Sequence, residues 1–135
     1  MRFVLLLLPS LAFGQSLNHD VTQANIHTTI CVPGWTKTVR PSVAYTNGVK
    51  RAKLLMIGRK PSDAPHYELD HAIPLALGGH PTSSENLHLQ PWAGPRGARA
   101  KDVVEARMHR YVCAGKVDLL TAQLCMADDW QGCPK

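Results

Sequence analysis

The stretch that decides the fold is YELDHAIPLALGG, residues 67–79. Apolar and polar side chains alternate from Tyr67 to His71, and this period of two predicts a β-strand. Pro74 cannot donate a ladder hydrogen bond, so the strand should end before it. A carboxylate, Asp70, directly precedes the imidazole of His71. Alone, such a pair is only a polar interruption of a half-buried strand, so its meaning depends on the residues around it.

A second strand and two helices follow this stretch. Residues 87–90, LHLQ, alternate again and end at Pro91. Residues 98–113 predict a helix, because apolar side chains recur every three or four positions. This apolar stripe consists of Val104, Met108, Tyr111 and Val112. Asp118 can cap a second helix over residues 119–127. The order strand, loop, strand, helix predicts an α+β fold.

The first half of the chain carries weaker signals. Residues 17–29 are polar and aperiodic, so we expect a loosely ordered arm there. Residues 31–41 indicate a short extended segment after a Pro-Gly turn. A turn at residues 46–48 and a short helix over residues 49–57 should follow, and residues 59–65 should form a loop.

The N-terminus has the layout of a secretory signal peptide. Met1 and Arg2 form a minimal positive region, residues 3–13 are almost wholly apolar, and small residues near Gly14 offer a cleavage site. A membrane anchor is the alternative, but the run is shorter than the roughly 20 apolar residues of a spanning helix. We therefore expect a secreted or periplasmic protein without stable membrane association after cleavage.

The four cysteines agree with export, because disulfides form in oxidising compartments. They predict two disulfides, for which three connectivities exist. We favour a pair of Cys31 with Cys113, which ties the N-terminal segment to the helix, and a pair of Cys125 with Cys133, which lie close in sequence. Free buried thiols are the alternative. No Cys-x-x-Cys pair occurs, so a zinc knuckle is not expected.

The net charge is modestly basic. It is formally +5, and it falls to +4 if Arg2 leaves with a signal peptide. A basic small domain tends to meet polyanions such as nucleic acid or a membrane surface. A soluble protein that happens to be basic is an equal alternative, so charge supports a nucleic-acid partner only together with a motif.

The motif LDHAIPLALGG, followed by ENLHLQ and a basic helix, resembles the HNH branch of the His-Me-finger (ββα-metal) endonucleases. In that family an Asp-His pair is followed by a proline, a loop that often contains glycines, and an Asn-Leu step. The resemblance covers about residues 67–113. It implies a small ββα-metal core with additional helices and a disulfide-tied N-terminal segment. The chain then divides into a signal peptide (1–15), an N-terminal arm and supporting segment (16–66), and a nuclease core with a C-terminal helix (67–135).

The resemblance assigns roles to three residues. His71 corresponds to the general base, Asp70 to a metal ligand, and Asn86 to the asparagine that braces the loop and orients the base. Phosphodiester hydrolysis needs a base for the attacking water and stabilisation of charge on the leaving oxygen. The imidazole also needs a fixed acceptor for its other nitrogen. Each residue also has a purely structural alternative. His71 can be a half-buried histidine with its hydrogen bonds satisfied, Asp70 a turn or helix-capping acid, and Asn86 a simple loop residue.

The chain departs from the family at the second metal ligand, which the family takes from the helix after the second strand. Asp102 is the first helix residue that can ligate, and we choose it. Glu105 and His109 share its helix face, and His88 on the second strand is a further candidate. A solvated helix surface is the alternative. Oxygen ligands favour Mg²⁺ or Mn²⁺, whereas a histidine ligand leaves Zn²⁺ or Ni²⁺ open.

Basic and aromatic side chains near the start of this helix suggest nucleic-acid contacts. Arg96, Arg99 and Lys101 are predicted to bind flanking phosphates, which positions a strand without reading its sequence. Ordinary surface charge is the alternative. Trp35 and Trp92 can stack on bases, although Trp more often anchors a small core.

The sequence thus predicts an exported, metal-dependent endonuclease of low sequence specificity, because no separate DNA-reading module accompanies the core. We expect DNA as the substrate, with RNA as the alternative. The alternatives are a non-catalytic, disulfide-stabilised nucleic-acid-binding module and a nuclease toxin delivered to competitor cells. The oligomeric state is not predicted.

Overall fold

The computed structural model describes residues 10–135, and the side chains of residues 13–135. The chain is a mixture of helix and strand, as predicted for an α+β fold. Most of the expected signal peptide, residues 1–9, lies outside the described residues. The elements, in order, are α1 (Ser10–Gln15), α2 (Trp35–Val39), α3 (Val43–Met56), β1 (Tyr67–His71), β2 (Leu87–Pro91), α4 (Ala98–Cys113) and α5 (Leu119–Asp128), with short 3₁₀ turns η1 (Gln23–Thr28), η2 (Pro61–His66), η3 (Leu75–Leu77), η4 (Ser84–Asn86) and η5 (Trp130–Gly132).

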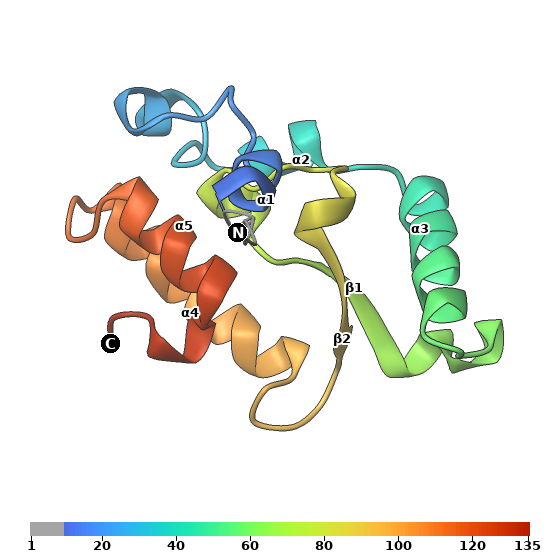
Figure 1. Ribbon diagram of the computed structural model, residues 1–135. Coiled ribbons are helices and arrows are strands. Elements are labelled where there is room, and N and C mark those ends of the chain that lie inside the picture. The colour runs from blue at the N-terminus through green and yellow to red at the C-terminus, as the bar shows by residue number, and fades with distance from the viewer. Residues whose placement is uncertain (1–9) are drawn as a thin grey trace, which may run out of the picture.

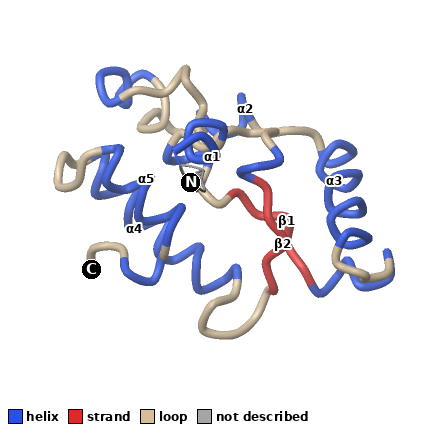
Figure 2. Tube along the Cα trace, viewed as in Figure 1, coloured by secondary structure: helices blue, strands red, loops and turns tan. Residues whose placement is uncertain are grey.

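β1 and β2 form a two-stranded antiparallel ribbon, and both predicted strands are confirmed. Asp70 pairs with His88 and His71 pairs with Leu87, so the Asp-His pair lies at the end of the ladder. In Figure 1 the ribbon lies between α3 on one side and the pair α4 and α5 on the other. Figure 2 shows how little of the chain is strand, so the helices have to supply the core.

The core forms where α4 and α5 pack together. The apolar stripe of α4 is buried at Val104, Met108 and Val112, as its spacing predicts. α5 begins directly after Asp118, which caps the helix. The Asp118 carboxylate accepts a hydrogen bond from the backbone N–H of Thr121 at 2.8 Å. The core cluster is completed by Ile73 and Leu77 from the loop between the strands, and by Leu119, Ala122, Met126 and Cys133.

The N-terminal arm is more ordered than its polar sequence suggests. Residues 23–28 form the 3₁₀ turn η1, and Val21, Ile26 and Ile30 are buried in the core cluster. The expectation of a loosely ordered arm is therefore wrong. Three isolated apolar residues are enough to hold the arm, because α4 and α5 offer a surface that the local sequence does not reveal.

Two local predictions on residues 31–57 are also wrong. Residues 35–39 form the short helix α2 instead of an extended segment. The turn expected at residues 46–48 is absent, because α3 runs from Val43 to Met56 through Gly48. Ser42 begins this helix, since its hydroxyl accepts from the backbone N–H of Tyr45 at 3.2 Å. A glycine inside a helix costs only about 1 kcal/mol relative to alanine, so packing overrides it here.

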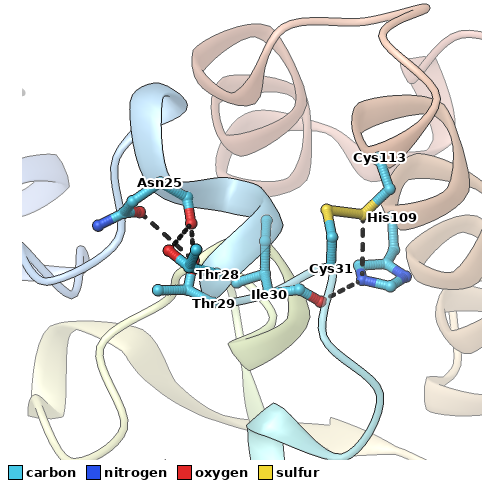
Figure 3. Close-up of a disulfide and its surroundings, with 7 residues drawn as sticks. All are labelled: Asn25, Thr28, Thr29, Ile30, Cys31, His109 and Cys113. Atoms are coloured by element: carbon cyan, nitrogen blue, oxygen red, sulfur yellow. Dashed lines mark hydrogen bonds between the residues drawn. A yellow bond between two sulfur atoms is a disulfide. The ribbon is translucent and has the colours of Figure 1, made fainter.

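Both disulfides have the predicted pairing, Cys31–Cys113 and Cys125–Cys133. Figure 3 shows the first of them beside His109, whose Nε2 bonds the Ile30 carbonyl oxygen at 2.7 Å. This bridge therefore joins the N-terminal arm to the C-terminal end of α4. Disulfides are typical of extracellular or periplasmic proteins. Within residues 10–135, no helix has the length and apolar character needed to cross a membrane.

Gly79 is expected to tolerate no side chain. A Cβ on Gly79 would lie 1.7 Å from the Ile73 carbonyl oxygen and 2.8 Å from Nδ2 of Asn86. We predict that Gly79→Ala lowers the free energy of unfolding by about 1–3 kcal/mol, as overpacking does, in urea denaturation. Gly48→Ala is the matched control, because open space surrounds Gly48 in α3, and alanine there should raise stability by up to about 1 kcal/mol. Equal stability of the wild-type and Gly79→Ala proteins would contradict this prediction.

Candidate functional site

A cavity of about 460 Å³ lies where β1, α4 and the α2–α3 region meet. Glu68, Asp70 and His71 line it from β1. Asp102 and Glu105 line it from the first half of α4. The structure therefore brings the predicted base and both predicted metal ligands to one cavity. It adds two further carboxylates.

The His71 ring is fixed by a backbone acceptor. Its Nε2 lies 2.9 Å from the carbonyl oxygen of Pro81. A carbonyl only accepts, so Nε2 must carry the proton and Nδ1 carries the lone pair of the neutral ring. Burial lowers the pKa of His71 below its usual 6.5, and the opposing effects of the Pro81 bond and of the Asp70 charge do not cancel it. The ring is therefore neutral at physiological pH.

Asn86 braces the loop that carries this acceptor. Its side chain is fully buried, with Oδ1 accepting from the Ile73 N–H at 2.8 Å and Nδ2 donating to the carbonyl oxygens of Ile73 and His80 at 3.0 Å each. His80 directly precedes Pro81. Asn86 therefore holds the segment whose carbonyl orients His71.

Lys101 has a different environment from the one expected. It is only 3% exposed, whereas the sequence predicts a surface contact with phosphate. Its Nζ lies 2.7 Å from Oδ2 of Asp70, 2.7 Å from Oε1 of Glu105 and 2.8 Å from the His71 carbonyl oxygen. Burial alone would lower the pKa of Lys101, but the two carboxylates outweigh burial and raise it. Lys101 is thus a buried ammonium that ties α4 to the Asp-His pair.

The carboxylates of the cavity affect one another's protonation. Burial, together with neighbouring carboxylates, raises the pKa of Glu68 and of Asp102. Burial also raises the pKa of Glu105 to about 7, against the lowering effect of Lys101. Oε2 of Glu68 is buried and has no hydrogen-bond partner within residues 10–135. Sequence reasoning missed Glu68, although its position two residues before Asp70 places both on one strand face.

The donor set suits a hard divalent cation. Mg²⁺ commonly takes one or two protein carboxylates and completes its shell with water and phosphate oxygens. Asp70 and Asp102 can supply such a pair, and the buried Glu68 oxygen without a hydrogen-bond partner offers a further acceptor. No group of three or more His, Cys, Asp or Glu side chains in residues 10–135 has the spacing of a metal site. A cation here would therefore need ligands from its substrate or from water.

The remaining candidate ligands do not line the cavity. His109 bonds the Ile30 carbonyl beside the disulfide. His88 is exposed, and its Nε2 bonds the Glu85 carbonyl oxygen at 3.0 Å. Neither histidine lines the cavity. The helix face predicted from Asp102, Glu105 and His109 is thus divided between two sites.

The basic and aromatic candidates are also divided. Arg96 is exposed and forms an ion pair with Asp129, at 3.4 Å. Arg99 is exposed beside Trp92, outside the cavity that holds His71. Trp35 packs against the core, whereas Trp92 is 36% exposed and lines that cavity. Trp92 therefore keeps the potential to stack on a base, and Trp35 has the anchoring position.

Comparison of the chain with protein-family models, curated proteins and solved structures found no match. The case for a function rests on the side chains in the cavity. They comprise a neutral imidazole held in one tautomer and four carboxylates. The buried Lys101 ammonium holds two of these carboxylates and the His71 backbone carbonyl oxygen.

Proposed function

We propose that this chain is an exported, metal-dependent endonuclease of the HNH type, which hydrolyses phosphodiester bonds in DNA with low sequence specificity. One observation carries the proposal. His71 lines a carboxylate-rich cavity with its Nε2 held by the Pro81 carbonyl, so Nδ1 is the nitrogen available as a base. A neutral imidazole with one fixed nitrogen is suited to take a proton from water. RNA is a second substrate class for the same chemistry.

Each polar group around His71 has a part in this reaction. Nδ1 of His71 takes the proton of the attacking water while Nε2–H stays on the Pro81 carbonyl. Asn86 keeps that carbonyl in place through its bonds to the loop. Lys101 fixes the Asp70 carboxylate and the His71 backbone, so the base and the acid keep one relative orientation.

Asp70 and Asp102 would hold the divalent cation. When bound, such an ion stabilises negative charge on the phosphate and on the leaving oxygen. Mg²⁺ and Mn²⁺ fit these oxygen donors best. Neither His88 nor His109 lines the cavity, which counts against a histidine ligand and hence against Zn²⁺ or Ni²⁺.

A plasmid assay tests the proposal. Purified protein is incubated with supercoiled plasmid and Mg²⁺ or Mn²⁺, with and without EDTA. The expected result is conversion to open-circular and linear forms that EDTA abolishes. If no divalent ion supports nicking of DNA or cleavage of RNA, the enzyme proposal is wrong.

A non-catalytic nucleic-acid-binding module is the second candidate. The observation in its favour is that residues 10–135 contain no preformed group of three metal-ligating side chains. Such a module would bind plasmid without cutting it, so the same incubation, followed by a gel-shift measurement, distinguishes the two. Delivery as a toxin would share the nuclease chemistry and the same assay result.

The rate of nicking is expected to depend on pH through His71. Burial lowers the pKa of His71 from 6.5, and only the neutral ring has the lone pair, so activity should fall as pH drops and reach half its plateau below pH 6.5. The measurement is kcat/KM against pH at fixed metal concentration and ionic strength, because kcat/KM reports the free enzyme. Thermal unfolding at each pH is the control for loss of fold. A fall in kcat/KM centred above pH 6.5 would contradict the assignment of His71 as the general base.

A further inference from the structure

One wall of the cavity lining does not come from β1 or α4 and is polar and basic. It is formed by α2, α3 and the short link between them. Thr36, Arg40, Thr46, Asn47 and Lys50 line the cavity from this side. None of these residues follows from the motif in β1 or from the basic start of α4. Their common position depends on how α3 lies beside the ribbon (Figure 1).

α3 is attached firmly enough to place this wall. The Tyr45 hydroxyl donates to the Thr82 carbonyl oxygen at 3.0 Å, and the Lys53 ammonium donates to the Ser84 carbonyl oxygen at 3.3 Å. Leu54, a residue of α3, has a fully buried side chain. Thr82 and Ser84 belong to the same loop that positions His71. The basic wall and the base are therefore held by one segment.

Arg40 and Lys50 have no protein partner for their charges. Within residues 10–135, neither side chain forms an ion pair or a hydrogen bond. Lys101 differs, since two carboxylates and a carbonyl use its ammonium. The charge of Arg40 nevertheless acts on the pKa of His71, and the charge of Lys50 acts on that of Glu68. Both cations therefore face the reacting groups while they remain available to a ligand.

We propose that Arg40 and Lys50 bind the phosphates next to the scissile bond and hold the nucleic-acid strand across the cavity. This inference rests on the proposed function. Four carboxylates line the cavity and repel a polyanion, so a nucleic-acid strand that enters it needs cations in the same lining. An arginine offers paired N–H donors to a phosphate, and a lysine adds a point charge. These contacts carry no sequence information, which agrees with low specificity.

This assignment replaces the basic start of α4 as the main phosphate contact. Lys101 is buried in the carboxylate network, and Arg96 is paired with Asp129. Arg99 lines a different pocket. A nucleic-acid strand bound at His71 would contact Arg40 and Lys50 before the basic residues of α4, because Arg40 and Lys50 line the same cavity as His71.

The test is DNA binding by charge-matched double variants. All proteins carry His71→Ala, so that the substrate stays intact in Mg²⁺. Arg40→Gln/Lys50→Gln is compared with Lys37→Gln/Arg51→Gln, which removes the same charge from the same region at residues outside the cavity. A fluorescent single-stranded DNA oligonucleotide and its duplex are titrated by anisotropy over a range of salt concentrations. Circular dichroism and thermal unfolding establish that each variant is folded.

The cavity variant is expected to lose about tenfold or more in affinity at low salt, since phosphate contacts dominate such binding. Its slope of log K against log salt should be smaller by about 2, one for each lost contact. The control pair should change little in either quantity. Equal losses in both variants would overturn the inference while leaving the proposed function in place. No binding by the His71→Ala parent would overturn both.

Discussion

Replacement of His71 with alanine is expected to reduce plasmid nicking by about 10²–10⁴-fold, the range that a positioned general base contributes. The ring lies in the cavity with Nε2 on the Pro81 carbonyl, so alanine removes the proton acceptor and leaves the carboxylates in place. The change should appear in kcat more than in KM, because His71 acts on water and does not bind phosphate. Initial rates with Mg²⁺ or Mn²⁺ measure it.

His88→Ala is the matched control for this prediction. His88 is an exposed histidine on β2, and its ring bonds only the Glu85 carbonyl oxygen. Its removal should leave the nicking rate unchanged. If His71→Ala nicks plasmid at the wild-type rate while both proteins are folded, His71 is not the base. Equal loss in the two variants would point to a general effect on the ribbon.

The substitution Lys101→Met is expected to lower the free energy of unfolding by about 3–5 kcal/mol, as removal of one partner from a buried ion pair does. Methionine is of similar length, so the loss comes from charge. Asp70 and Glu105 would remain inside with 13% and 23% of their side chains exposed and no cation between them. Urea denaturation at neutral pH measures the change.

The pH dependence of this loss distinguishes charge from packing. The pKa of Glu105 is already raised to about 7 by burial, and loss of Lys101 would raise it further. The folded variant would then bind more protons than the unfolded chain as pH falls below 7, so its stability should recover toward pH 5 and be lowest at pH 8.

A second substitution and an exposed lysine serve as controls. Adding Glu105→Gln to Lys101→Met should restore part of the stability, because it removes one uncompensated charge. Lys37→Met, at an exposed position on α2, should have no measurable effect. A deficit in Lys101→Met that is equal at pH 5 and pH 8 would contradict an electrostatic origin.

The sequence predicts the second half of the fold better than the first. β1, β2, α4 and α5 follow strong local rules, namely alternation, a stripe at helical spacing and an aspartate cap. α2 and α3 do not follow from local pattern, because α2 is a single short turn and Gly48 lies inside α3. The burial of Val21 and Ile26 depends on α4 and α5, which no window of the arm contains.

The candidate site is similarly divided between local and tertiary information. Asp70 and His71 lie at the end of β1 and Asn86 directly before β2, because local strand and turn signals place them. Lys101 is predicted as a phosphate contact at the surface, because it lies among basic residues at the start of α4. It is buried because α4 begins against the end of β1, which spacing along one helix does not encode.

The Cys31–Cys113 bridge has a topological consequence. It closes a covalent ring of the chain, and every residue that lines the cavity, from Thr36 to Glu105, lies inside that ring. One proteolytic cut in the exposed 92–96 segment would open the ring without releasing a fragment. The two parts would stay tethered, so their effective concentration would remain high enough to favour reassociation. A single nick in the oxidised protein would thus leave one covalent molecule, whereas the same nick after reduction would leave two.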